Sequence, residues 1–160
     1  MKRVLGFVSV VVMAVLVQGV VLAQTSPMIG TWNLNAEKSK DTPRPMPKSL
    51  TLTMEAAGDG VKSTSQATGA DGTSTSWGYT ANFDGKDSPI TGTGAPGGAD
   101  TIALKHLSAN KTEAILKKGG NVVRTARLIV AKDGKVMKIV AKGKDPDGKE
   151  AKTALVFDKQ

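Results

Sequence analysis

The chain has 160 residues, of which 22 are basic and 14 are acidic, so its formal net charge is +8. This length accommodates one domain with a single hydrophobic core. The chain contains no cysteine, which excludes disulfide bonds, and we therefore expect a fold that depends on packing alone. The single histidine, His106, argues against a catalytic zinc site, because such sites need three protein ligands.

The first 23 residues have the pattern of a secretory signal peptide. Lys2 and Arg3 form a charged start, residues 4–17 are almost wholly apolar, and Ala23 is the small residue expected at a cleavage site. We predict a signal-peptide helix over residues 1–23, one mature domain over residues 24–160, and a periplasmic or secreted location in a bacterium. A retained membrane anchor is the alternative. It is disfavoured because glycine and polar residues interrupt the apolar run, which is short for a span of about 20 residues.

The mature chain remains basic. Without Lys2 and Arg3, 22 − 2 = 20 basic residues stand against 14 acidic ones, a net charge of +6. Basic proteins meet nucleic acids, anionic lipids or acidic ligands, but lysines in turns and on outer strand faces also block edge-to-edge pairing. No aromatic platform lies among these lysines, as binders of single-stranded nucleic acid require. We therefore expect no nucleic-acid partner and no stable membrane insertion after signal cleavage.

Apolar and polar residues alternate with period two through most of the mature chain, and glycine- and aspartate-rich turns break the pattern. This pattern predicts about ten short strands, over residues 30–34, 48–55, 61–68, 76–83, 88–91, 101–106, 112–117, 122–130, 136–142 and 149–157. Hairpins join most of them into a meander, and closing a meander removes its edges. We therefore predict an all-β, antiparallel up-and-down barrel of about eight to ten strands. A β-sandwich, which needs longer crossover connections, is the alternative.

The first strand of the mature domain carries Gly30, Trp32 and Leu34 on one face, because side chains alternate across a strand. Gly30 leaves room for another backbone or a large group to approach. We expect Trp32 to close one end of the barrel, with later strands wrapped around it. An ordinary core tryptophan in a β-sandwich fits these residues as well.

Residues 36–47 form the longest connection in the chain. The segment begins with residues that fit one helical turn, and three prolines then impose an extended path: Pro43, Pro45 and Pro47. Long connections are often functional. This one is either a lid over one mouth of the barrel or a strap that merely crosses the barrel end.

Most of the aromatic residues lie on one face of the strand at residues 76–83. A barrel with this number of strands can hold a small ligand, and Ser63 and Ser65 suit a partly wet interior. The alternative is that the same residues fill a packed interior without a cavity. The predicted ligand-binding residues are Trp32, Leu52, Met54, Trp77, Tyr79, Phe83 and, for an acidic head group, Arg44.

The segment Gly30-Thr31-Trp32-Asn33-Leu34 at the start of such a meander resembles the lipocalin and fatty-acid-binding proteins, the calycins. The resemblance implies a lipocalin-like barrel. Lipocalins bring an arginine from a late strand over the tryptophan, and here only Arg124 or Arg127 is available for that position. The last-strand Arg-x-Tyr of fatty-acid-binding proteins is absent. The chain is also similar to small exported bacterial proteins of unassigned function that share the Gly-Thr-Trp-x-Leu-Asn start.

Catalytic motifs are absent from the sequence. Gly92-Thr93-Gly94-Ala95-Pro96-Gly97 formally matches a dinucleotide motif, but a strand and not a helix follows it. His106 shares a strand face with apolar residues, and no Gly-x-Ser-x-Gly elbow accompanies it. We predict an exported non-enzymatic protein, without catalytic residues, metal or cofactor, that binds a small apolar or amphipathic ligand. The alternative is a structural or interaction module of the bacterial envelope.

Overall fold

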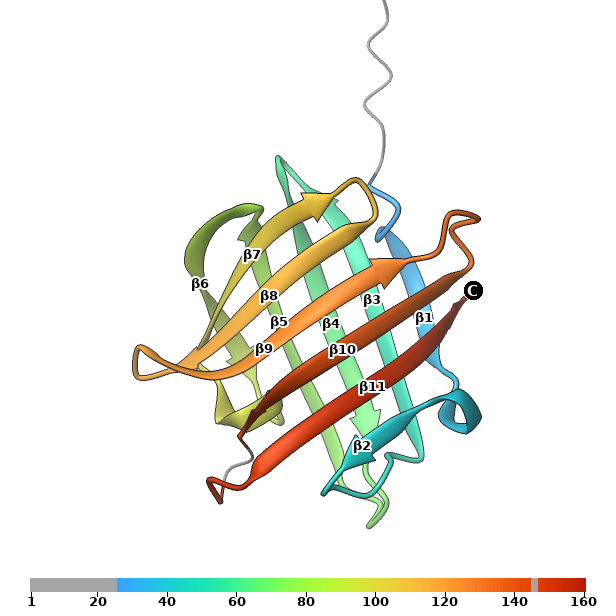
Figure 1. Cartoon of the computed structure of the whole chain (residues 1–160), viewed down its shortest axis with the longest axis vertical. Coiled ribbons are helices and arrows are strands. Elements are labelled where there is room, and N and C mark those ends of the chain that lie inside the picture. The colour runs from blue at the N-terminus through green and yellow to red at the C-terminus, as the bar shows by residue number, and fades with distance from the viewer. Residues whose placement is uncertain (1–25, 145–146) are drawn as a thin grey trace, which may run out of the picture.

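The computed structural model of the chain describes residues 26–144 and 147–160. The predicted signal peptide and its cleavage site lie outside the described residues. The described part is all-β, and it contains eleven antiparallel strands and two 3-10 helices (Figure 1). Its elements are β1 (Gly30–Leu34), η1 (Ala36–Lys38), β2 (Lys40–Thr42), β3 (Ser49–Ala57), β4 (Gly60–Thr68), β5 (Ser74–Asn82), β6 (Asp84–Gly92), η2 (Pro96–Gly98), β7 (Thr101–Ser108), β8 (Lys111–Lys118), β9 (Asn121–Val130), β10 (Val136–Lys144) and β11 (Glu150–Lys159).

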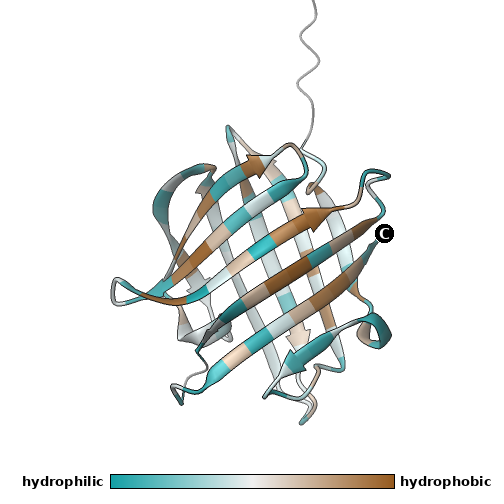
Figure 2. Cartoon of the chain, in the orientation of Figure 1, coloured by the Kyte–Doolittle hydropathy of each residue, from teal (hydrophilic) through white to brown (hydrophobic). Residues whose placement is uncertain are grey.

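Ten of these strands form a closed up-and-down barrel. From β3 to β11 each strand pairs with the next in sequence, and β1 pairs with both β3 and β11, which closes the ring. The predicted barrel is confirmed, and the sandwich alternative is wrong because the first and last strands are hydrogen-bonded to each other. Bands of hydrophilic and hydrophobic residues alternate along the strands (Figure 2). A barrel needs this pattern because alternate residues of each strand point to the interior and to the solvent.

The short strand β2 lies outside this ring and covers the edge of β11 next to β1. Leu34 is opposite Phe157 at the end of β1, and Lys40 is opposite Ala154 at the start of β2. Between them the chain leaves the sheet through η1. Ser39 holds this detour to β11, since its Oγ accepts from the Val156 N–H at 2.8 Å and donates to the Asn35 carbonyl at 2.6 Å. Residues 36–47, here called the strap, are therefore anchored to the sheet before they cross the barrel end.

The turn signal Asp84-Gly85-Lys86, between the strands predicted at residues 76–83 and 88–91, lies where the chain reverses from β5 to β6. These strands are antiparallel, with Trp77 opposite Gly92 and Tyr79 opposite Ile90, so their register centres on this segment. The strand β6 is longer than predicted, since it begins at Asp84 and pairs there with Lys105 of β7. The Asp84 side chain accepts the Lys86 N–H at 3.0 Å, so the aspartate turn chemistry is present. The β6–β7 pair also has a register shift between Asp84 and Asp87.

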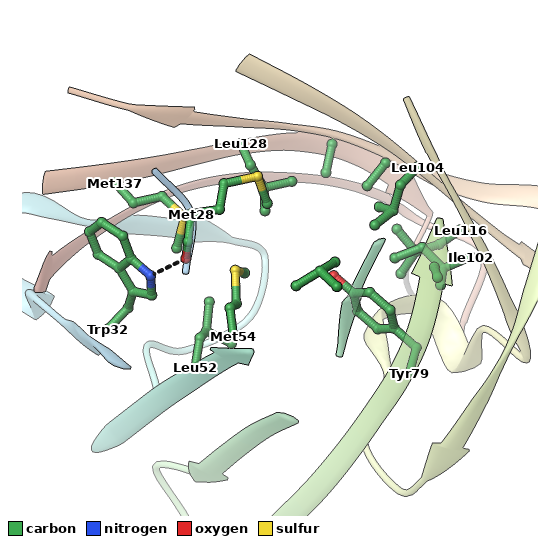
Figure 3. Close-up of a cluster of buried hydrophobic side chains, with 14 of the residues drawn as sticks. Met28, Trp32, Leu52, Met54, Tyr79, Ile102, Leu104, Leu116, Leu128 and Met137 are labelled. Carbon is green, nitrogen blue, oxygen red and sulfur yellow. Dashed lines mark hydrogen bonds between the residues drawn. The ribbon is translucent and has the colours of Figure 1, made fainter. Parts of the chain in front are cut away.

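Trp32 closes one end of the barrel, as predicted. Its side chain is wholly buried, and its indole N–H donates to the Met28 carbonyl at 2.8 Å. Met28, from the segment before β1, is buried beside it, and Thr112 donates a hydrogen bond to the Met28 sulfur at 3.1 Å. Figure 3 shows the Trp32 ring and Met28 together at one end of the buried cluster. This end of the barrel, the closed end, is filled by side chains.

The group above the Trp32 ring is a lysine. From the resemblance to lipocalins, Arg124 or Arg127 was expected to lie over the tryptophan ring, and neither does. Arg127 is exposed on the outer face of β9, and Arg124 lies at the other end of the barrel, bonded to Thr153. Lys159 on the last strand provides the positive charge instead.

Candidate functional site: a cavity inside the barrel

The barrel encloses a cavity of about 820 Å³. It lies on the barrel axis, because eight strands of the barrel line it: β3, β4, β5, β7, β8, β9, β10 and β11. The short strand β2 adds Asp41 to the lining. At the end opposite Trp32, its walls are the strap, the β4–β5 turn and the loop before η2. We call this end the mouth. The volume lies in the range of pockets that bury a small ligand.

The wall of the cavity is mainly apolar below the mouth. Inward positions of facing strands supply it, because alternate residues of each strand point to the barrel axis. The strand β3 provides Leu52 and Met54, and β5 provides Tyr79 on the same side of the barrel, since Met54 and Tyr79 are both opposite Ser63 of the intervening strand β4. Figure 3 shows these three side chains. The remaining apolar lining residues on strands are Leu50, Ala67, Trp77, Ile102, Ala114, Leu116, Ala126, Leu128, Ile139, Ala141, Leu155 and Phe157.

Two serines and a tyrosine interrupt this apolar wall on one side. Ser63 and Ser65 are buried inward residues of β4, and they are opposite Tyr79 and Trp77 of β5. Burial raises the pKa of the Tyr79 hydroxyl, and hydrogen bonding to the Ser63 side chain opposes this shift. The phenol is therefore a neutral donor and acceptor over the ordinary pH range, suited to a polar group on an otherwise apolar ligand.

A polar cluster lies at the mouth, where the strap meets β9 and β11. Arg44 and Asp41 of the strap form an ion pair at 3.2 Å. The Thr153 hydroxyl donates to the Asp41 carboxylate at 2.7 Å and accepts from the Arg124 guanidinium at 3.1 Å. All four residues line the cavity. A chain of hydrogen bonds therefore joins the strap to the barrel wall at the place where a ligand would enter.

Arg124 is the buried charge of this cluster. The residue is only 4 % exposed, on the inward face of β9. Burial lowers the pKa of its guanidinium, the nearby charge of Arg44 lowers it further, and the Asp41 charge acts in the opposite direction. An arginine stays protonated through such shifts, because its ordinary pKa is far above neutral. A full positive charge therefore lies in the cavity wall.

Five of the seven predicted ligand-binding residues line the cavity: Arg44, Leu52, Met54, Trp77 and Tyr79. Trp32 and Phe83 lie outside the lining. Trp32 fills the closed end, and Phe83 stacks on the ring of His106 with 3.8 Å between centroids. His106 also contacts the Thr112 hydroxyl through Nδ1 at 3.2 Å, which places it at the rim of the closed end. A role of these residues in ligand binding stays a prediction.

The sequence did not predict that Arg124, Asp41 and Thr153 form a group at the cavity. A signal for Arg124 existed, since it is the charged member of an inward series that continues with Ala126, Leu128 and Val130. A charge in such a series needs a partner or a ligand. No comparable signal marked Asp41 or Thr153, because their contact depends on how the strap crosses the sheet.

The described residues include no group of three or more histidine, aspartate and glutamate side chains arranged to hold a metal ion. Within the same residues, no helix has the length and apolar character that crossing a bilayer requires. Comparison with protein-family models and with curated protein sequences gives no match. The fold and the site therefore define the class to which the described part belongs: a closed antiparallel β-barrel with an internal cavity and a polar mouth that carries two arginines and two aspartates.

Proposed function

We propose that this protein binds one small apolar or amphipathic molecule inside the barrel and performs no chemistry on it. The observation that carries this proposal is the cavity of about 820 Å³, whose apolar wall ends in a polar mouth. An interior evolved only for stability is packed at the density of an organic crystal, with few voids larger than a water molecule. Open volume on this scale costs stability, and a bound ligand would recover that cost.

The cavity lining suits an amphipathic guest. Leu52 and Met54 offer an adaptable apolar surface on β3. Trp77 and Tyr79 lie with ring centroids 6.1 Å apart on β5, beyond the intervening strand β4, and Tyr79 adds a hydroxyl. We assign the apolar body of the ligand to these residues. The polar part then lies toward the mouth.

We further propose that the protein is a lipocalin-like carrier of the bacterial envelope, exported by its first 23 residues. The closed barrel and the Gly-Thr-Trp start support the likeness, and the apolar run after Lys2 and Arg3 supports export. The intact mass of the exported protein tests the second point. An intact mass equal to that of residues 24–160 supports cleavage. A protein that retains residues 4–17 and is found in the membrane fraction contradicts it.

The alternative, an interaction module of the envelope, rests on a different observation. Three large apolar side chains are exposed on the outside of the barrel, Leu107, Val122 and Val140. They lie on three different strands, β7, β9 and β10. Single exposed apolar residues are common on soluble proteins, so the cavity is the stronger basis for a function.

The direct test is to purify the exported protein from its own host, extract it with organic solvent and analyse the extract by mass spectrometry. We expect about one small molecule per protein, and less of it with the Tyr79→Ala and Trp77→Ala variants. The outward variant Lys142→Ala is the matched control and should retain the molecule. A protein that is empty on isolation and binds no single-chain amphiphile in solution contradicts the proposal.

A further inference from the structure

Arg124 has an incomplete set of partners for a buried arginine. A guanidinium has five N–H donors. One nitrogen, Nη2, donates to the Thr153 hydroxyl at 3.1 Å, and the buried Nε has no hydrogen-bond partner among the described residues. No carboxylate of the described residues forms an ion pair with it, since the only ion pair in the cluster joins Asp41 to Arg44. The closest link to a negative charge runs through a hydroxyl group.

The charges within the polar cluster of Arg44, Asp41, Thr153 and Arg124 do not cancel. Arg44 and Arg124 are opposed there by Asp41 alone among the residues of the cluster. Asp71 also lines the mouth, but its carboxylate is exposed and bonded to the N–H and hydroxyl of Thr73 at 2.9 Å. One positive charge is thus left over in a wall that is mainly apolar. Burying an unpaired charge is costly, and an anion placed against it recovers that cost.

We propose that the mouth recognises the anionic head group of a single-chain amphiphile, with Arg124 as the binding residue and Asp41 as an internal competitor. This inference rests on the proposed function, because the chain of the amphiphile must occupy the cavity. The head group accepts hydrogen bonds from Arg124, at the end of the cavity that the strap covers. Carboxylate and phosphate monoester head groups share this chemistry.

Asp41 limits the affinity in this arrangement. Its side chain is only 8 % exposed, and Thr153 and Arg44 hold it beside the place that the head group would take. Two negative groups so close repel each other in a partly desolvated site. The strap carboxylate therefore pairs with Arg44 alone while the cavity is empty and opposes the ligand when it enters, which keeps binding reversible.

The test compares four ligands with the same twelve-carbon chain: dodecanoate, dodecyl phosphate, dodecanol and dodecylamine, each titrated into the full mature protein by calorimetry. We expect dodecanoate or dodecyl phosphate to bind about tenfold to a hundredfold more tightly than dodecanol, the effect of one charge-assisted hydrogen-bonded contact. Whichever anion binds more tightly identifies the head-group class. Dodecylamine should bind most weakly.

Three variants separate the roles. Arg124→Gln should remove the preference for the anions, so that they bind no more tightly than dodecanol does to the same variant. Arg127→Gln is the matched control, because Arg127 lies three positions further along β9 and is exposed on the outer face; it should behave as the wild type. Asp41→Asn should increase anion affinity several-fold relative to dodecanol affinity. This variant keeps the test decisive if Arg124→Gln does not fold.

The outcomes distinguish the two proposals. If dodecanol binds as tightly as the anions, or if Asp41→Asn weakens anion binding, the head-group inference is overturned while the ligand-binding function stands. If dodecylamine binds most tightly of the four, the head-group inference is likewise overturned, and Asp41 is then the residue that binds a cationic head group. If none of the four ligands binds, both proposals fail.

Discussion

Lys159 places its ammonium group 5.0 Å from the centre of the Trp32 ring, and the two residues are directly opposite each other where the barrel closes. The contact joins the first barrel strand to the last. Gly30, on the same face of β1, makes it possible, because a side chain there would meet Lys159: its first carbon would lie 2.6 Å from the lysine Cε. The glycine of the Gly-x-Trp segment thus leaves room for a cation over the tryptophan.

We expect Lys159→Met to reduce the free energy of unfolding by about 0.5–1 kcal/mol, the usual size of an exposed cation–π contact. Methionine keeps most of the aliphatic stem and removes the charge, and Lys159→Arg should keep the stability. Lys142→Met, on the outer face of β10, is the control and should change little. Urea melts measure all three variants. A loss for Lys142→Met as large as that for Lys159→Met would contradict a specific contact with Trp32.

Trp32 itself should be among the most important residues for stability. Trp32→Ala removes a wholly buried ring and leaves the Met28 carbonyl without its indole donor, so we expect a loss of about 3–5 kcal/mol. Lys86→Ala, at a side chain that is 85 % exposed, should stay within about 0.5 kcal/mol. Denaturant melts compare them, and small, equal losses would mean that the closed end is not packed as described.

The cavity predicts an unusual result for a small-to-large substitution. Ala126 on β9 lines the cavity, so the longer side chain of Ala126→Leu has free space to enter and should leave stability unchanged or raise it. Ala81 on β5 is also buried but is not a lining residue. Ala81→Leu should cost about 1–3 kcal/mol through overpacking. Thermal melts test this, and a similar cost for both variants would indicate a filled interior.

Tyr79 can be titrated alone, because it is the only tyrosine in the chain. Burial raises its pKa above the ordinary value of 10.0. The folded state therefore holds this proton more strongly than the unfolded state, so its contribution to stability is complete below pH 10.0 and is lost as the pH rises through the folded-state pKa. Phenolate absorbance should show a midpoint above 10.0, with no signal in Tyr79→Phe. A midpoint at or below the ordinary value would place the hydroxyl in water.

The barrel could be predicted from the sequence because its strands and turns are recognised from residues that are close together in the chain. Alternation along each strand and glycine-rich turns identify the strands, and the burial of Ser63 and Ser65 follows from the same period. The aspartate–glycine signal at Asp84 located the reversal between β5 and β6. The length of β6 was not predictable from it, because the residues from Asp84 onward also pair with β7 through an irregular register.

The mouth of the cavity was less accessible to prediction. Thr153 and Asp41 are 112 positions apart in sequence, and Arg124 and Thr153 are 29 apart. Their contacts depend on the register of β2 against β11 and on the path of the strap. Arg44 could be proposed because it stands among prolines in a long connection. Arg124 could not be paired with Asp41, and Lys159 could not be placed over Trp32, before the closure of the ring was known.

The most direct test of a ligand-binding cavity uses the two tryptophans, since Trp77 lines the cavity and Trp32 does not. A fatty acid brominated along its chain quenches indole fluorescence on contact, so it can be titrated into a Trp32→Phe variant, which keeps only Trp77, and into a Trp77→Phe variant, which keeps only Trp32. We predict saturable quenching of Trp77 at one fatty acid per protein and much weaker quenching of Trp32. Quenching of Trp77 that never saturates, or no quenching of it at all, would contradict the account.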